Sequence, residues 1–168
     1  YRESGRLIRT DTELLMAQTV QGLGGQVDEW IDKNILMLRT AARLNDIATM
    51  DRVKQEHNLK AINQEYPWMY LVFTLGANGM NIARNDDMPL TDYSDRDYYK
   101  DVMQGKNLSW QVLIEKTSKK PAVVLAVPIK AADNSIIGVM AAAMNIDDIS
   151  KIVAAWKKGK TGFAFLVD

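Results

Sequence analysis

Two apolar stretches near the end of the chain decide the fold: AVVLAVPIK at residues 122–130 and IIGVMAAAMNI at residues 136–146. Asp133 and Asn134 lie between them and favour a turn. Apolar runs of this length on either side of turn residues predict the two strands of a β-hairpin. A preceding run at residues 110–116 predicts a third strand beside them.

A second hairpin is predicted upstream. Residues 68–74 (WMYLVFT) are rich in aromatic and β-branched side chains, and a turn with Gly76 and Gly79 follows. Residues 80–84 then form the expected return strand. Five strands connected mainly by hairpins predict an α+β fold with an antiparallel sheet.

Helices are expected before, between and after these strands. Apolar residues recur every three or four positions over residues 14–42, which predicts a long amphipathic helix that covers one face of the sheet. A second helix is predicted over residues 50–65, with Asp51 near its start. A short helix is expected over residues 95–103, and another is expected to begin at Asp147.

Composition excludes several classes of function. The chain has 21 Lys plus Arg and 21 Asp plus Glu, so it lacks the basic surplus of a general nucleic-acid binder. It has no Cys, which excludes thiolate nucleophiles, disulfides and iron–sulfur ligation. The single His, His57, leaves no pair for a two-His metal site, and it is expected to be a solvated helix residue. We expect no metal ion and no cofactor.

The chain shows no predicted membrane span of its own. Its longest apolar stretch, residues 136–144, is about half of the roughly 20 residues that a spanning helix needs. The sequence begins without Met and ends in the strand-like residues 162–168, so we expect an excised part of a longer protein. Flanking segments of that protein would provide any membrane anchor.

Acidic residues form three clusters, at residues 86–87, 92–97 and 147–148. A hydrolase with paired carboxylates would need two of them to face each other across a cleft. Acidic loops and helix starts account for all three clusters more simply. A hydrolase is therefore the weakest of the functional hypotheses.

The segment DYSDRDYY at residues 92–99 suggests a binding site. It places Arg96 among Tyr93, Tyr98 and Tyr99 at the expected start of a short helix. Arginine offers a planar fork for a carboxylate, and tyrosine rings offer walls and hydroxyl donors. This combination is typical of a pocket for a small carboxylate ligand. The same spacing fits a surface Arg96 paired with one of the segment's aspartates, with the rings covering the sheet.

Four segments together resemble the double Cache family of extracytoplasmic bacterial sensor domains. They are DYSDRDYY at residues 92–99, KPAVVLAVPI at 120–129, GVM at 138–140 leading to IDDI at 146–149, and GKTGFAFLVD at 159–168. The resemblance implies a PAS-like module that is not an enzyme and lies between two transmembrane helices, in the periplasmic part of a bacterial inner-membrane protein. It implies a long N-terminal helix over residues 1–48, a membrane-distal ligand-binding module over 49–158 and the truncated start of a membrane-proximal module over 159–168.

The resemblance also implies site residues. In the amino-acid-binding branch of the family, an Arg two residues before an aromatic pair grips the ligand carboxylate, and Arg96, Tyr98 and Tyr99 match these positions. An Asp in the last strand grips the ligand amine there, whereas this chain has Ala143 at that position and Asn145 two residues later. An organic acid such as acetate or pyruvate is therefore expected as readily as an amino acid.

The remaining candidate site residues are Asp92 and four aromatic residues. Asp92 belongs to the segment 92–99 itself, and the four aromatic side chains are expected either to form walls of the pocket or to pack in the core: Tyr70, Trp68, Tyr93 and Trp110.

The leading hypothesis is a ligand-sensing domain of a transmembrane receptor, with a chemoreceptor as the favoured class of receptor. The full receptor is expected to be a homodimer. The alternative is a ligand-free interaction or dimerisation module of a sensor histidine kinase or a cyclic-dinucleotide enzyme.

Overall fold

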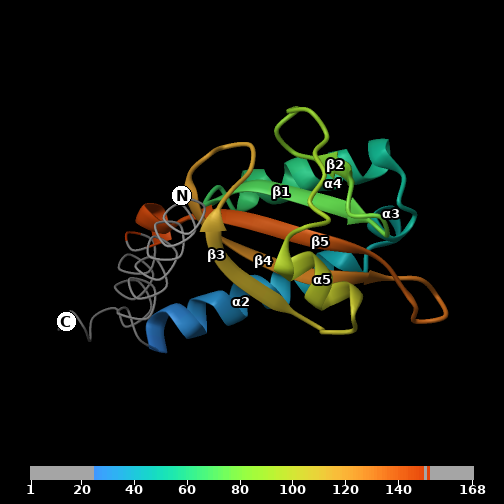
Figure 1. The fold of residues 1–168 in the computed structure, drawn as a ribbon, viewed down its shortest axis with the longest axis horizontal. Coiled ribbons are helices and arrows are strands. Elements are labelled where there is room, and N and C mark those ends of the chain that lie inside the picture. The colour runs from blue at the N-terminus through green and yellow to red at the C-terminus, as the bar shows by residue number, and fades with distance from the viewer. Residues whose placement is uncertain (1–24, 150, 152–168) are drawn as a thin grey trace, which may run out of the picture.

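The computed structural model describes residues 25–149 and residue 151. A five-stranded antiparallel sheet forms its centre, with the strand order β2-β1-β5-β4-β3. Helices α2 and α4 cover one face of the sheet and the short helix α5 covers the other (Figure 1). The predicted α+β class and the antiparallel five-stranded sheet are confirmed.

The five strands lie close to their predicted positions: β1 at Met69–Gly76, β2 at Asn81–Arg84, β3 at Ser109–Ile114, β4 at Pro121–Lys130 and β5 at Ile136–Asn145. Strand β3 ends two residues earlier than predicted, because the chain turns at Glu115, whose carboxylate accepts hydrogen bonds from the backbone of that turn. Strand β5 ends at Asn145, whose side chain accepts a hydrogen bond from the backbone N–H of Asp147.

The helices are α2 at Gly25–Ala42, α3 at Asn45–Ala48, α4 at Arg52–Glu65 and α5 at Asp97–Met103. Helix α2 ends where the apolar periodicity ends, and residues 14–24 lie outside the described residues. Asp51 is the N-cap of α4 and accepts a hydrogen bond from Lys54 N. Helix α5 begins at Asp97 rather than at residue 95, and Arg96 is its N-cap. The single-turn α3 was not predicted.

Several other expectations concern the helices and the ends of the chain. His57 is exposed on α4, as expected. None of the helices among the described residues is long and apolar enough to span a membrane. Residues 146–149 are helical, which agrees with the predicted helix near Asp147. The expected start of a second module, residues 159–168, lies outside the described residues, so the predicted module boundaries stay predictions.

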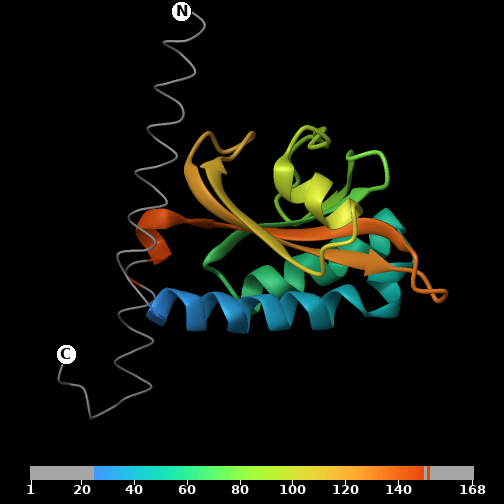
Figure 2. The ribbon, with the colours of Figure 1, turned by 60° about the horizontal axis from the view of Figure 1, so that its bottom comes forward.

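Successive side chains of each strand point to opposite faces of the sheet, so the two faces carry two separate hydrophobic cores. In β5, Met140, Ala142 and Met144 pack in the core between the sheet and helices α2 and α4. Val139, Ala141 and Ala143 pack in the core on the opposite face, between the sheet and α5. Figure 2 shows the sheet between these two layers, with α2 along one side and α5 on the other. Since the segment 92–99 leads into α5, the candidate site belongs to the α5 side.

Candidate functional site

Arg96 is held in a buried position at the start of α5. Its side chain is 9% exposed, and its backbone N–H donates to the carbonyl of Tyr93. Nη2 donates to the carbonyl oxygen of Ile114 at 2.7 Å, while Nε is buried and has no hydrogen-bond partner. The alternative of a surface arginine paired with a neighbouring aspartate is therefore wrong, and Asp95 pairs with Lys116 instead.

Tyr98 follows Arg96 by two residues, in the first turn of α5. Its side chain is 1% exposed, and its hydroxyl makes no hydrogen bond to any residue in the described part of the chain. Burial raises the pKa of Tyr98 well above its usual value, and the charge of Glu115 acts in the same direction. The phenol is therefore neutral near pH 7 and able to donate a hydrogen bond. Arg96 is close enough to oppose this shift electrostatically.

Alanines of β5 pack in the core on the α5 side of the sheet. Ala141 and Ala143 of β5 are fully buried on this face, and Ala143 pairs with Val124 of β4. Strand β5 carries no carboxylate, at Ala143 or elsewhere. Asn145 does not take the place of a carboxylate, because its side-chain oxygen accepts the backbone N–H of Asp147 at the end of the strand.

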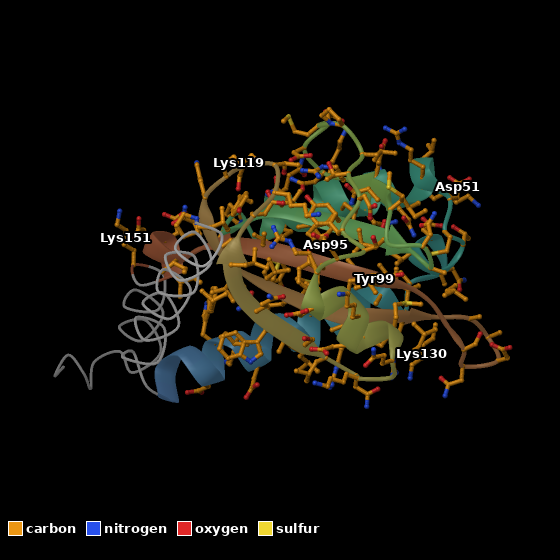
Figure 3. All side chains as sticks on the ribbon, viewed as in Figure 1. Asp51, Asp95, Tyr99, Lys119, Lys130 and Lys151 are labelled. Atoms are coloured by element: carbon orange, nitrogen blue, oxygen red, sulfur yellow. The ribbon has the colours of Figure 1, made fainter. Side chains whose placement is uncertain are left out.

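The other matched aromatic residue, Tyr99, has a structural partner. Its hydroxyl donates to the carbonyl of Ala77 at 2.6 Å and so ties α5 to the turn between β1 and β2. Figure 3 shows Tyr99 on α5, with Asp95 in the loop before the helix. Asp92 is exposed, and its carboxylate accepts the backbone N–H of Ser94. Tyr99 and Asp92 thus both shape the segment that carries Arg96.

Both tryptophans face the α2 side of the sheet, opposite to α5, so of the two alternatives that the sequence left open, Trp68 fits core packing. Trp68 packs on the α2 side, where its Nε1 donates to Asn34 at 2.9 Å and its ring contacts Trp30. Trp110 is 40% exposed and shares its strand face with Val112, which packs against the same α2-side core. The sequence did not reveal this placement, because one residue of register decides which face of the sheet a side chain reaches.

Tyr93 and Tyr70 do lie on the α5 side, in a polar network that the sequence did not reveal. The Tyr93 ring packs on Phe73 with centroids 5.0 Å apart, and its hydroxyl donates to Glu115 Oε2 at 2.7 Å. The hydroxyl of Tyr70 lies 3.0 Å from Oγ of Ser118 in the turn after β3. Burial, followed by the hydrogen bond to Glu115, raises the pKa of Tyr93 to about 12.

Arg84 anchors the other end of this network. It is 1% exposed, and two of its nitrogens contact the two oxygens of Asp86 at 2.8 and 2.9 Å. Arg84 also donates to the hydroxyls of Tyr93 and Thr117. Burial acts to raise the pKa of Asp86, but the hydrogen bonds and charge of Arg84, together with backbone hydrogen bonds, outweigh burial and lower the pKa. No local pattern identifies such a network, since Arg84 and Thr117 are 33 residues apart.

Lys116, in the turn after β3, contacts the loop that leads to Arg96. Its Nζ contacts Asp95 Oδ1 at 2.5 Å and the carbonyl oxygen of Asp92 at 2.9 Å, and it lies 5.7 Å from the centre of the Tyr93 ring. These contacts join the turn after β3 to the loop before α5. Arg96 and Tyr98, which follow this loop, are both buried.

Three carboxylates of the acidic clusters are engaged in salt bridges. Asp86 pairs with Arg84, Asp87 with Lys60 and Asp95 with Lys116. In the part of the chain that the structure describes, no group of three or more His, Cys, Asp and Glu side chains is placed to hold a metal ion. The salt bridges account for these carboxylates.

The sequence also matches a known protein family. A sequence profile described as a Cache domain matches residues 4–168. No curated protein matches the chain in sequence.

Solved structures share its fold. The ligand-binding domain of the Campylobacter jejuni chemoreceptor Tlp3, in complex with L-valine, has a TM-score of 0.62 and 16% identity and covers 86% of this chain and 64% of its own. The V. cholerae histidine kinase DctB sensor domain has a TM-score of 0.66 and 15% identity, with 84% and 60% covered. The ligand-binding domain of the Pseudomonas fluorescens chemoreceptor CtaA, in complex with L-serine, has a TM-score of 0.62 and 17% identity, with 89% and 63% covered. The chain thus spans less than two thirds of each of these domains.

Proposed function

The chain belongs to the Cache domain family, and on that premise we propose that it is the membrane-distal, ligand-binding part of a periplasmic sensor domain in a bacterial transmembrane receptor. Its ligand is a small molecule with a carboxylate group. The module binds and reports this ligand and catalyses no reaction. Chemotaxis is the proposed output, because the Tlp3 and CtaA chemoreceptors described above carry amino acids in domains of this fold.

One observation carries this proposal: Nε of Arg96 is buried without a hydrogen-bond partner in the described part of the chain, and Arg96 is close enough to Tyr98 to affect the pKa of its hydroxyl. A buried donor without a partner costs about 1–3 kcal/mol, and more when the group is charged. A ligand carboxylate would accept from both groups and remove this cost. The planar guanidinium suits a carboxylate, whose two oxygens match its fork of donors.

The ligand need not carry an amine. Ala143 stands where the amine-gripping Asp is found in the amino-acid-binding branch of the family, and Asn145 is engaged at the end of β5. An ammonium group at Ala143 would be buried without a carboxylate partner, which is unfavourable. We therefore favour a small organic acid over an α-amino acid.

Ligand entry requires movement, because Arg96 and Tyr98 are shielded in this conformation. The contacts of Lys116 with Asp95 and Asp92 must open and close again for a ligand to reach Arg96. A ligand changes signalling only if it binds one conformation more tightly than the other. Closure of the loop before α5 over the ligand would shift the sheet against α2, the helix that leads toward the preceding segment of the receptor.

Isothermal titration of the 168-residue protein with acetate, pyruvate and a panel of amino acids tests the proposal. We expect at least one organic acid to bind, Arg96→Ala to abolish binding and Arg96→Lys to retain part of it. Arg52→Ala provides the control, since Arg52 is an exposed residue on α4 that pairs with Glu56. Equal loss of binding in Arg52→Ala and Arg96→Ala, or binding unaffected by Arg96→Ala, would refute the carboxylate site.

A ligand-free interaction module is the second candidate function. An apolar groove between α2 and α4, with Leu36 at 64% exposed, favours it. A homodimer of the full receptor would be able to use this surface. An intact receptor that signals normally with Arg96→Ala would support this candidate over the sensor.

A further inference from the structure

A cationic cavity lies where the end of α2 meets the β4–β5 hairpin. Its volume is about 640 Å³, and it is lined by Arg39, Ala42, Arg43, Asn107, Pro128, Lys130, Ala131 and Asn134. The lining contains three cations and two amides but no carboxylate. Its volume lies within the range of about 300–1,000 Å³ that is usual for small-molecule sites.

Three separate elements build this cavity. Arg39 and Arg43 are one helical turn apart, at the end of α2 and just after it. Lys130 ends β4, and Asn134 lies in the turn before β5 with a φ of 74°. Asn107 comes from the loop between α5 and β3. Figure 3 shows Lys130 at the end of the sheet beyond α5, and Figure 2 shows that α2 ends beside the β4–β5 hairpin.

The cations of the cavity have no counter-charges within the described part of the chain. Among those residues, none of Arg39, Arg43 and Lys130 forms a salt bridge or a side-chain hydrogen bond. The negative end of the helix dipole favours Arg39 in the last turn of α2. The dipole does not account for Lys130, which a different element brings to the same cavity. Arg39, Arg43 and Lys130 line the same cavity with no carboxylate in its lining, so an anion bound there would reduce their mutual repulsion.

We propose that this cavity binds a small oxyanion with two or more negative charges, of the phosphate or polycarboxylate class. The guanidinium groups of Arg39 and Arg43 and the ammonium group of Lys130 can donate hydrogen bonds to several oxygens of one anion. The side-chain amides of Asn107 and Asn134 provide further, uncharged donors. A bound anion would bridge the end of α2, the β4–β5 hairpin and the loop that follows α5. This site shares no residue with the Arg96 site and does not depend on the sensor proposal.

Titration calorimetry of the 168-residue protein in dilute chloride buffer, with pyrophosphate and citrate as probes, tests this inference. We expect binding of at least one probe, and at least tenfold weaker binding by the double variant Arg39→Gln/Arg43→Gln and by Lys130→Gln. Which probe binds more tightly distinguishes a phosphate site from a polycarboxylate site. Lys54→Gln, an exposed helical residue whose side chain is outside the cavity, controls for the loss of one positive charge. Arg96→Ala controls for binding at the sensor site.

Several results would overturn the inference. Equal weakening by Lys54→Gln would show nonspecific attraction to positive charge. Loss of binding in Arg96→Ala, with binding retained in the double variant, would place the anion at the sensor site. Binding of poly-glutamate without binding of either probe would show that the surface takes an acidic chain instead. Thermal unfolding of every variant checks that each is folded.

Discussion

Arg84 and Glu115, both 1% exposed, are joined through two hydroxyl groups. The hydroxyls of Tyr93 and Thr117 each accept a hydrogen bond from Arg84 and donate one to Glu115, over distances of 2.7 to 3.1 Å. This arrangement satisfies two buried charges and holds β2, the loop before α5 and the turn after β3 together. The network thereby supports the segment from which Arg96 projects.

Glu115→Gln tests how much this network contributes to stability. Oε1 of Glu115 accepts three hydrogen bonds and Oε2 accepts one, so an amide in its place directs a donor group against other donors. Hydrogen bonds to charged groups are worth about 1.5–3 kcal/mol, so we expect a loss of about 2–3 kcal/mol in urea unfolding. Glu56→Gln, which removes only an exposed pair with Arg52, should cost less than about 0.5 kcal/mol. Similar losses in the two variants would contradict a special role for Glu115.

The same carboxylate predicts a dependence of stability on pH. Burial acts to raise the pKa of Glu115, but hydrogen bonds from the backbone of Ser118 and from Tyr93 and Thr117 outweigh it and lower the pKa. Its contribution is thus complete above the unfolded-state pKa of about 4.3 and is lost as the pH falls through the lower folded-state pKa. The stability difference between wild type and Glu115→Gln should shrink between about pH 5 and pH 3, as urea midpoints would show. If the stability difference between wild type and Glu115→Gln did not change with pH, the stabilisation would not come from the ionised carboxylate of Glu115.

Tyr98→Phe tests the second donor of the proposed carboxylate site. The variant removes a hydroxyl without a partner among the described residues, so unfolding stability should change little or increase slightly. Affinity for an organic acid should fall about tenfold or more, the effect of a hydrogen bond to a charged group. Calorimetry measures the affinity and urea unfolding measures the stability. Tyr66→Phe, on the α2 side of the sheet, is the matched control and should leave affinity unchanged.

Lys116→Gln tests the outer contact over the site. Its pair with Asp95 is partly exposed and should contribute less than about 1 kcal/mol to stability. Hydrogen exchange should become faster at the backbone amides of Tyr93 and Arg96, because the loop before α5 loses its tie to the turn after β3. Lys120→Gln, in the same turn region, should leave these rates unchanged. Unchanged exchange in both variants would show that Lys116 does not restrain the loop.

Comparison of Gly79→Ala with Gly105→Ala tests whether close packing against Ser94 positions the segment before α5. Gly79 has a φ of 85°, and a Cβ there would overlap Cβ of Ser94, whereas Gly105 has a φ of 113° with open space around it. Gly105→Ala should cost about 1–2 kcal/mol from backbone strain alone. Gly79→Ala should cost clearly more, because it also separates the β1–β2 turn from Ser94. Equal losses in thermal unfolding would mean that the contact with Ser94 is not structurally important.

Strand and helix identity followed from local patterns, since propensity, alternation and turn residues act within a few positions. The apolar runs in β4 and β5 and the Asp51 cap of α4 were predicted at or near their observed limits. The segment carrying Arg96 was also identified from residue types alone. The short helix α3 was missed, because a single turn has too few residues for a periodic signal.

The amino-acid sequence by itself therefore determined the class of fold and its five strands, and it singled out Arg96 as a candidate binding residue. Only the tertiary structure decided that Trp68 and Trp110 lie away from Arg96, because strand register assigns each side chain to a face. Only the tertiary structure showed the Arg84–Glu115 network and the cationic cavity. Their members come from separate elements, and their proximity is a consequence of how the sheet packs against its helices.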